Sequence, residues 1–260
     1  MYKNLYEPLP DLHGYLRRIG FAADSVKDPV ALNDLIFSHL STVPFENLDV
    51  YDGDQEPKLG IADLYDKIVT RRRGGFCVEL NALFMSLLQA LDISCYPVMA
   101  KVVWNKPFLP PYTHRATVAE MDGHLWFCDV GFGGPAPAGV LQIDTDEIQN
   151  VRGTNFRVVT EGEAVTVCRE QDGKFLPLIA FFMRKADPVD FIPLSFHQSM
   201  SKSSYFRSKI ILCIHTENGT KVIDGPSFRE KVGNEVVREI DVSDPQVLSS
   251  VLETEFGVKI

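Results

Sequence analysis

Apolar residues recur every three or four positions along the first third of the chain. The stripes run over residues 12–19, 32–40, 61–69 and 80–91, with the spacing that places side chains on one face of an α-helix. Each of the first two stripes follows an aspartate, a residue that favours the N-cap position. The sequence therefore predicts four helices before residue 92.

From residue 93 onward the pattern changes to short runs rich in β-branched and aromatic side chains. These runs cover residues 93–104, 116–130, 156–167 and 176–182. Side chains of this kind favour the half-buried surface of a β-sheet. We therefore expect the middle of the chain to consist mostly of strands, arranged as a barrel or a sandwich.

The last third combines both patterns. Two short strand-like runs, 210–215 and 220–223, flank a turn predicted at Asn218-Gly219, and Asp244 begins a final apolar helix. An α+β protein with three units accounts for this order of elements. The expected units are a helical bundle over residues 1–91, a strand-rich unit over 92–199 and a smaller α/β unit over 200–260.

Charge and hydropathy narrow the range of partners. The 260 residues carry a formal net charge of −9, which argues against nucleic acid as the main partner because phosphate backbones bind basic surfaces. A local basic patch is still compatible with a phosphate-bearing small molecule. The longest apolar stretch, residues 178–183, is far shorter than the roughly 20 residues that span a bilayer. We therefore expect neither a nucleic-acid nor a membrane partner, while the sequence does not indicate an oligomeric state.

Cysteine usage indicates a reducing compartment. The chain has five cysteines, at positions 77, 95, 128, 168 and 213. An odd number without a C-x-x-C pair is typical of reduced thiols in a cytosolic protein, and not of a disulfide framework or a zinc ribbon. The spacing of metal ligands in H-E-x-x-H is also missing. We therefore expect a cytoplasmic protein that binds no metal.

Cys77 differs from the other cysteines because it follows Gly74-Gly75 and opens the last predicted helix of the first third. At a helix N-terminus the free amides and the macrodipole stabilise a thiolate. Glycines also let a ligand approach the backbone closely. The alternative is a small buried apolar residue, as most free cysteines are. The other four cysteines lie in apparent strands and are expected to be of this second kind.

A second candidate pair lies in a predicted hairpin. Asp122-Gly123 is a strong signal for a two-residue turn, and this turn makes His114 and Asp129 diagonal neighbours on one face. Such diagonal neighbours lie about 7–8 Å apart. An aspartate is disfavoured inside a strand, so Asp129 is better explained if it orients the imidazole. A local cap or an exposed charge is the alternative.

Cys77, His114 and Asp129 follow one another along the chain as thiol, imidazole and carboxylate. Together these groups suit nucleophilic acyl chemistry. The thiolate attacks a carbonyl, the imidazole moves a proton, and the carboxylate orients the ring.

Four short motifs resemble the signatures of the arylamine N-acetyltransferases, in the order of that family. They are VPFENL (43–48), RGGFCVELN (73–81), THRATV (113–118) and DVGFGG (129–134). The resemblance covers essentially the whole chain and implies a helical bundle, a β-barrel and an α/β lid around a cysteine-protease-like core. By matching positions, it implies a catalytic triad of Cys77, His114 and Asp129. It also implies that Arg73 pairs with Glu46 beneath the site.

The resemblance further implies a reaction. Family members carry an acetyl group from acetyl-CoA on the cysteine and pass it, in a ping-pong mechanism, to arylamines, hydrazines or the oxygen of arylhydroxylamines. Phe45 and Phe132 resemble residues that line the acceptor pocket. Phe206 is a weaker match because SKSSYF departs from the usual sequence of the family at this position. Residues 191–206 are the part of the chain that resembles the family least. The alternatives are an amide synthase or thiol hydrolase with the same triad, and a non-catalytic binding protein.

Binding of acetyl-CoA to an acidic protein requires a local positive patch, because CoA carries several phosphate charges. The segment 199–210 contains Lys202, Arg207 and Lys209 and no acidic residue, and its serines at 199, 201, 203 and 204 can serve as hydroxyl donors. We therefore predict that this segment contacts the phosphates, the alternative being a solvated linker. Gly133 is a further candidate contact, although its glycine-rich stretch also suits a tight exit from a strand.

Overall fold

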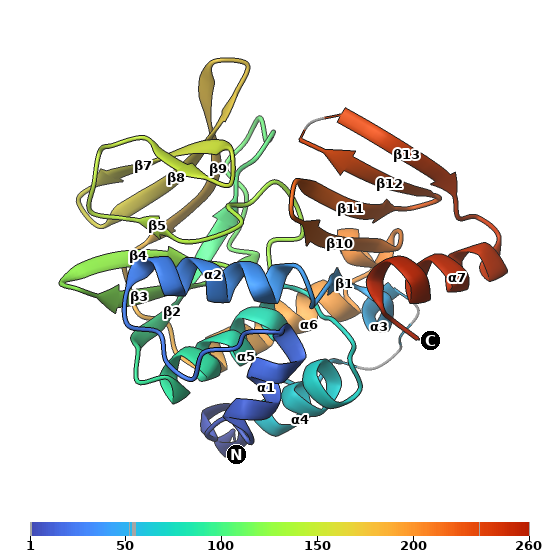
Figure 1. Cartoon of the computed structure of the whole chain (residues 1–260), viewed down its shortest axis with the longest axis horizontal. Coiled ribbons are helices and arrows are strands. Elements are labelled where there is room, and N and C mark those ends of the chain that lie inside the picture. Colours follow the sequence, from blue (N-terminus) through green and yellow to red (C-terminus); the bar gives the residue numbers. More distant parts are fainter. Residues whose placement is uncertain (1, 52, 54–55, 234, 260) are drawn as a thin grey trace.

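Figure 1 shows the computed structural model of the chain, which describes residues 2–51, 53, 56–233 and 235–259. Helices form the base of the molecule. Two sheets stand above them side by side, one built mainly from the middle of the chain and one mainly from its end. The predicted α+β class is confirmed.

The first two helices have the caps that the sequence predicts. α1 (Leu12–Ile19) is capped by the carboxylate of Asp11, which accepts a first-turn amide at 2.9 Å, and it ends at Gly20 in the left-handed conformation. Asp28 caps α2 (Pro29–Leu40) in the same way. The remaining helical segments of this region are η1 (Lys3–Tyr6), α3 (Leu48–Tyr51), α4 (Ile61–Tyr65), the π-helical turn η2 (Asp66–Thr70) and α5 (Cys77–Ala90).

The middle of the chain forms an antiparallel sheet that curves into a nearly closed barrel. In the described part of the chain its strand order is β5-β4-β3-β2-β9-β8-β7-β6. The strands are β2 (Ser94–Val102), β3 (His114–Met121), β4 (His124–Cys128), β5 (Leu141–Gln142), β6 (Gln149–Val151), β7 (Thr154–Glu161), β8 (Ala164–Gln171) and β9 (Lys174–Phe182). The predicted hairpin is confirmed, because Met121 pairs with His124 and Thr117 pairs with Cys128 across the turn.

The second sheet has the order β1-β10-β11-β12-β13 among the described residues. Its members from the end of the chain are β10 (Ile211–Thr216), β11 (Gly219–Asp224), β12 (Ser227–Val232) and β13 (Glu235–Asp241), and α7 (Pro245–Phe256) packs against them. β1 (Phe45–Glu46) comes instead from the N-terminal third, and Phe45 pairs with Cys213. This short strand joins the helical region to the last third of the chain.

The turn predicted at Asn218-Gly219 is wrong by one residue. Thr216 pairs with Gly219, so Glu217 and Asn218 form the turn. Gly219 already belongs to β11, where an added Cβ would lie 1.9 Å from the carbonyl oxygen of Lys231. The glycine is therefore required by the close approach of β12 and not by the geometry of the turn.

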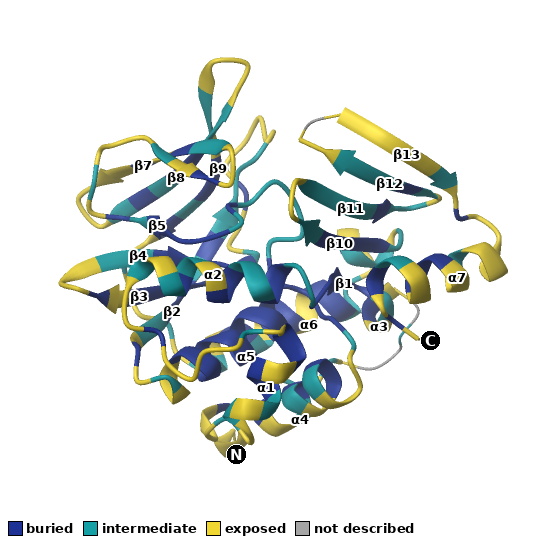
Figure 2. Ribbon diagram, viewed as in Figure 1, coloured by how far each residue is buried: buried dark blue, intermediate teal, exposed yellow. Residues whose placement is uncertain are grey.

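α5 lies at the centre of the molecule and is dark blue along nearly its whole length in Figure 2. Its side chains are mostly apolar, which suits a helix enclosed by other elements. Three hydrophobic clusters form among the described residues: one around α5, one inside the barrel and one between the second sheet and α7. α6 (Ile192–Met200) contributes Leu194 to the cluster around α5, although it follows the barrel in the sequence. The boundaries at residues 91 and 199 remain predictions.

Candidate active site

Cys77 is the first residue of α5, and only 3% of its surface is exposed. The glycines before it are closely packed. A Cβ on Gly74 would lie 2.0 Å from the carbonyl oxygen of Pro44. A Cβ on Gly75 would lie 2.8 Å from the carboxylate of Glu79. The two glycines thus accommodate neighbouring segments of the protein, which is a different reason from the ligand approach that the sequence suggested.

His114 and Asp129 form a buried hydrogen-bonded pair. His114 begins β3, Asp129 follows β4, and Nε2 of the ring donates to Oδ2 of the carboxylate at 2.6 Å. The other carboxylate oxygen, Oδ1, accepts the side-chain amide of Asn81 at 2.8 Å and the backbone N–H of Gly131 at 2.9 Å. Both oxygens are therefore fixed, and the hairpin brings these two side chains together as its register predicts.

The thiol of Cys77 lies close enough to the ring of His114 to help raise the pKa of that ring. Since Asp129 occupies Nε2, Nδ1 is the ring nitrogen that remains for the thiol. Burial disfavours the charged ring and lowers the pKa of His114. The negative charge of Asp129, the hydrogen bond that the ring donates to it and the neighbouring Cys77 outweigh burial and raise this pKa to about 10. The site therefore favours a protonated ring beside the sulfur.

Two residues that the sequence interpretation missed also belong to this site. Asn81, one helical turn after Cys77, accepts the backbone N–H of Val130 at 3.0 Å and so ties α5 to the segment that carries Asp129. Gln198 on α6 places both ends of its side-chain amide 3.8 Å from Sγ of Cys77. The i, i+4 spacing from Cys77 could have indicated Asn81. Gln198 had no such signal, because it lies in the least family-like segment.

A network of charged side chains lies under the start of α5. Arg73 Nη2 pairs with Glu46 at 2.7 Å, the contact that the family resemblance implied, and with Asp49 at 2.8 Å. Lys67, which the sequence interpretation missed, pairs with Glu79 at 2.8 Å and with Asp49 at 2.9 Å. Burial opposes the charge of Lys67, but Glu79 and the neighbouring carboxylates raise its pKa above the ordinary range. These ion pairs keep the segment before Cys77 in place.

The three predicted pocket phenylalanines lie around the triad in two groups. The ring of Phe132 meets the ring of His114 edge to face, with centroids 5.7 Å apart. Phe206 lies 5.9 Å from Phe45 and 6.0 Å from Phe76, again between ring centroids. Aromatic rings from four parts of the chain thus pack beside His114 and beside Phe76, the residue that precedes the nucleophile.

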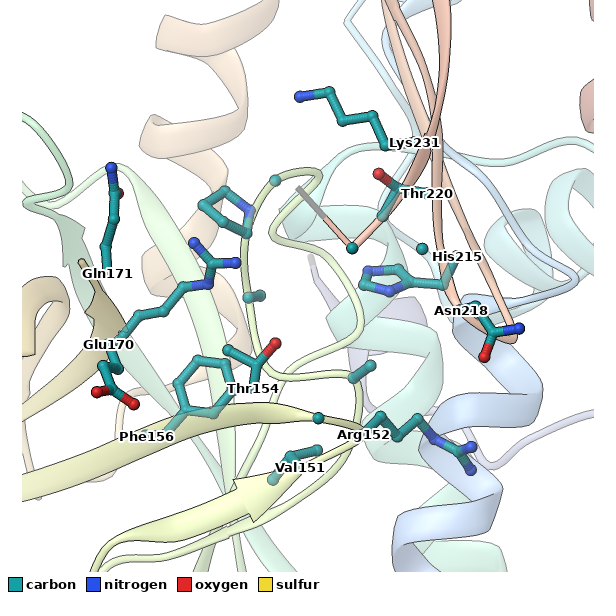
Figure 3. A pocket seen from close by; sticks show the side chains of 18 of the residues that line it. Val151, Arg152, Thr154, Phe156, Glu170, Gln171, His215, Asn218, Thr220 and Lys231 are labelled. Atoms are coloured by element: carbon teal, nitrogen blue, oxygen red, sulfur yellow. The ribbon is translucent and has the colours of Figure 1, made fainter. Parts of the chain in front are cut away.

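A cleft of about 640 Å³ separates the barrel from the second sheet. Figure 3 shows Glu170 and Gln171 on the barrel side, and Thr220 and Lys231 on strands of the second sheet. Gly133 lines the same cleft. The cleft is therefore bounded in part by the loop that follows Asp129.

Gly133 lines this cleft and also lies against the ring of Phe45. Its φ is +68°, and an added Cβ would lie 2.5 Å from the ring of Phe45. A side chain at this position would be strained and would collide with that ring. The glycine is therefore explained by packing and by the turn out of β4, while its contact with a substrate remains a prediction.

Comparison with known proteins agrees with the geometry. An arylamine N-acetyltransferase / N-hydroxyarylamine O-acetyltransferase of Salmonella typhimurium is 28% identical over 251 residues, covering 96% of this chain and 89% of that protein. A sequence model of a family described as N-acetyltransferase matches residues 30–260. The chain belongs to the arylamine N-acetyltransferase family. The predicted family and its acyltransferase class are thereby confirmed.

Solved structures of arylamine N-acetyltransferases share this fold. The structure from Salmonella typhimurium superposes with a TM-score of 0.91 at 26% identity, covering 97% of this chain and 92% of that one. The Mycobacterium marinum enzyme, solved in complex with CoA, gives 0.88 at 27% identity, covering 95% and 93%. The predicted helical bundle, barrel and α/β end are confirmed at the level of the whole fold.

The residues predicted to contact CoA in this family member have varied surroundings. Lys202 is exposed. Arg207 Nη1 donates to the carbonyl oxygens of Gly53 and Ser199 at 3.0 and 2.8 Å. Lys209 pairs with Asp224 at 2.6 Å, so the acid-free segment acquires an acidic neighbour from β11. Their contact with CoA remains a prediction.

Among the residues that the structure describes, histidine, cysteine, aspartate and glutamate side chains do not gather in threes in a way that could hold a metal ion. Within the same residues, every helix is too short or too polar to cross a membrane.

Proposed function

We propose that the chain transfers an acetyl group from acetyl-CoA to arylamines and arylhydrazines, or to the oxygen of arylhydroxylamines, and carries it on Cys77 in between. The buried contact of Cys77 with the His114–Asp129 pair is the observation that carries this proposal. A thiolate, a proton carrier and an orienting carboxylate are the groups that a ping-pong acyl transfer requires.

In the first half-reaction, the Cys77 thiolate adds to the thioester carbonyl carbon and the carbonyl electron pair moves onto oxygen. The carbonyl then re-forms and the bond to the CoA sulfur breaks. His114 gives its proton to the departing sulfur, which leaves acetyl-Cys77 and a neutral ring. Asp129 keeps Nε2 protonated and the ring oriented throughout.

In the second half-reaction, the neutral amine adds to the acetyl carbon and His114 Nδ1 takes a proton from the amine nitrogen. Breaking the bond between carbon and Sγ returns the thiolate and releases the acetylated amine. An alkyl amine such as lysine, with a pKa of about 10.4, is protonated near neutral pH. An arylamine delocalises its lone pair into the ring, stays neutral and can attack.

Relatives and neighbouring side chains support these substrates. The Mycobacterium marinum relative was solved with CoA, and the name of the Salmonella relative includes N-hydroxyarylamine O-acetyltransferase. The contacts of Phe132 with His114 and of Phe45 with Phe206 support the proposal that these three rings meet the aromatic ring of the acceptor. We propose that CoA is contacted by Gly133 and by the segment that contains Lys202, Arg207 and Lys209.

We also propose a cytoplasmic location. The five cysteines are free, as is usual in a reducing compartment.

Incubation with acetyl-CoA alone, followed by intact-mass measurement, tests the proposal. We expect a gain of one acetyl group that Cys77→Ala abolishes and Cys168→Ala, a change at a buried cysteine of the barrel, leaves unaltered. Addition of an arylamine should then remove the label. Steady release of CoA without an amine would indicate a hydrolase, and a protein that gains no mass would be a non-catalytic relative. Acetyl transfer by Cys77→Ala would refute the mechanism.

A further inference from the structure

Gln198 lies against the sulfur of the nucleophile. Its side chain projects from α6, only 5% of the residue is exposed, and Oε1 and Nε2 each lie 3.8 Å from Sγ of Cys77. Sequence motifs did not single out this residue. A primary amide is buried in a protein only where its N–H and C=O groups find partners, and this one is buried beside the reacting atom.

The orientation of this amide is fixed by a backbone carbonyl. Nε2 of Gln198 donates to the carbonyl oxygen of Thr113 at 2.7 Å. A carbonyl can only accept, so the nitrogen end of the amide must lie there. One of the two N–H bonds of Nε2 is thereby used. The other is available on the side of Sγ, the second group that Nε2 contacts.

The helix that carries Gln198 is held firmly at this point. The backbone oxygen of Gln198 accepts the hydroxyl of Ser204 at 2.5 Å, and the backbone oxygen of Ser199 accepts Arg207. Leu194 of the same helix is buried in the cluster around α5. A donor placed on such a rigid element needs little rearrangement when charge develops near it.

We propose that Nε2 of Gln198 donates a hydrogen bond to the oxyanion that forms when a nucleophile adds to the acetyl carbonyl. This inference rests on the proposed acyl transfer through Cys77. When the thiolate adds, the carbonyl electron pair moves onto the oxygen, which is then separated from Sγ by one carbon atom. A donor that already contacts Sγ is within reach of that oxygen. The hydrogen bond persists until the pair returns to carbon and the bond to the leaving group breaks.

This role makes a prediction that other roles of Gln198 do not. An oxyanion forms in both half-reactions, so loss of the donor slows acetylation of Cys77 and transfer to the amine alike. Alkylation of Cys77 by iodoacetamide displaces iodide at a saturated carbon and forms no oxyanion. The rate of alkylation therefore measures the reactivity of the sulfur beside His114 and does not depend on a donor to an oxyanion.

The test compares these rates in Gln198→Met, which keeps the length of the side chain but has no N–H. Acetylation by p-nitrophenyl acetate and transfer to an arylamine should each fall by about 10²–10³-fold, the usual loss for one oxyanion donor. Alkylation should stay within about threefold of the wild-type rate. His197→Leu, an exposed position on the same helix, is the matched control and should alter none of the three rates.

Gln198→Glu is the second variant, because it keeps the shape and the oxygen of the side chain and lacks its N–H donors. It should also slow both acyl steps more than alkylation. Equal loss of alkylation and acylation in both variants would overturn the proposal and assign Gln198 to positioning Cys77. Loss confined to the amine step would also overturn it, in favour of an acceptor for the amine N–H. If the wild type forms no acetyl-enzyme, the proposed function itself fails.

Discussion

The ring of His114 is enclosed by protein, and its charge depends mainly on Asp129. Burial lowers the pKa of this ring, and the carboxylate of Asp129 is the main group that reverses the direction. The aspartate has no other cation beside it among the contacts that the described residues make; its other partners are amides. The charge of the His114 ring therefore depends mainly on one buried carboxylate, that of Asp129.

Asp129→Asn should leave the fold intact and cripple acetyl transfer. The amide oxygen can still accept from Asn81 and Gly131, but without the negative charge burial dominates and the pKa of His114 falls. The wrong tautomer and the lost charge should lower kcat by about 10²–10⁴-fold. In the wild type, the raised pKa keeps the ring of His114 protonated in mildly acid solution. The protonated ring stabilises the thiolate form of Cys77, so we expect iodoacetamide to label Cys77 there. Labelling of the variant that stays as fast at that pH would contradict this account.

Single residues differ in how far the sequence reveals them. Cys77, His114 and Asp129 were found because their order, a helix start and a two-residue turn are local signals. Lys67 and Gln198 were not, because an internal lysine in a helical stripe and a glutamine on a late helix look like ordinary surface residues. Their positions depend on contacts between segments that are far apart in the sequence.

At the level of elements, the start of α5 is held in position by charged side chains beneath it. Glu79, in the first turn of the helix, accepts the backbone N–H of Phe76 at 3.1 Å and pairs with Lys67. Both charged side chains are almost fully buried. The N-terminus that carries Cys77 is thus fixed by a buried ion pair, which the sequence interpretation, based on the helix start and the two glycines, did not include.

Lys67→Met should destabilise the protein by about 3–5 kcal/mol, because it leaves Glu79 buried without its cation. The double variant Lys67→Met/Glu79→Gln should recover more than half of that loss, since neither charge then remains. Urea unfolding measures both. Lys58→Met, at an exposed lysine, is the control and should change the midpoint little. A loss for Lys67→Met no larger than for this control would show that the buried pair is not required.

Element boundaries were predictable where capping residues mark them, as Asp11 and Asp28 do. β1 was not, because a strand of two residues has no periodicity of its own. Its pairing with β10 depends on the arrangement of the whole chain. The same reason explains why Gly219 was assigned to a turn, when a neighbouring strand requires it.

For the molecule as a whole, the net charge of −9 opposes the approach of CoA. Among the three basic residues proposed for the phosphates, Lys209 is paired with Asp224, and Arg207 holds two backbone carbonyls. Arg207→Glu would therefore disturb the chain around α6 as well as the charge. Lys202, which is exposed, gives the cleaner test.

Lys202→Glu should raise the KM for acetyl-CoA, because it replaces attraction to the phosphates by repulsion. Added salt should reduce the difference, since it screens exposed charges. A short thioester donor without the nucleotide should be used at the wild-type rate. Lys27→Glu changes the net charge equally at an exposed position before α2 and should have a smaller effect. Equal effects of the two variants, or equal losses with both donors, would exclude a local phosphate contact at Lys202.

The pairing of β1 with β10 also bears on how the enzyme is made. Asn47, directly after β1, accepts the backbone N–H of Ile211, 164 positions further along the chain. Closing so long a loop is entropically unfavourable, and contacts of this separation form slowly. On the ribosome, Phe45 and Glu46 cannot reach their partners in β10 until most of the chain has been synthesised. The nucleophile and the ion pairs beneath it are therefore translated early, but the contacts of Phe45 with Phe206 and β10 form only after most of the chain has been made.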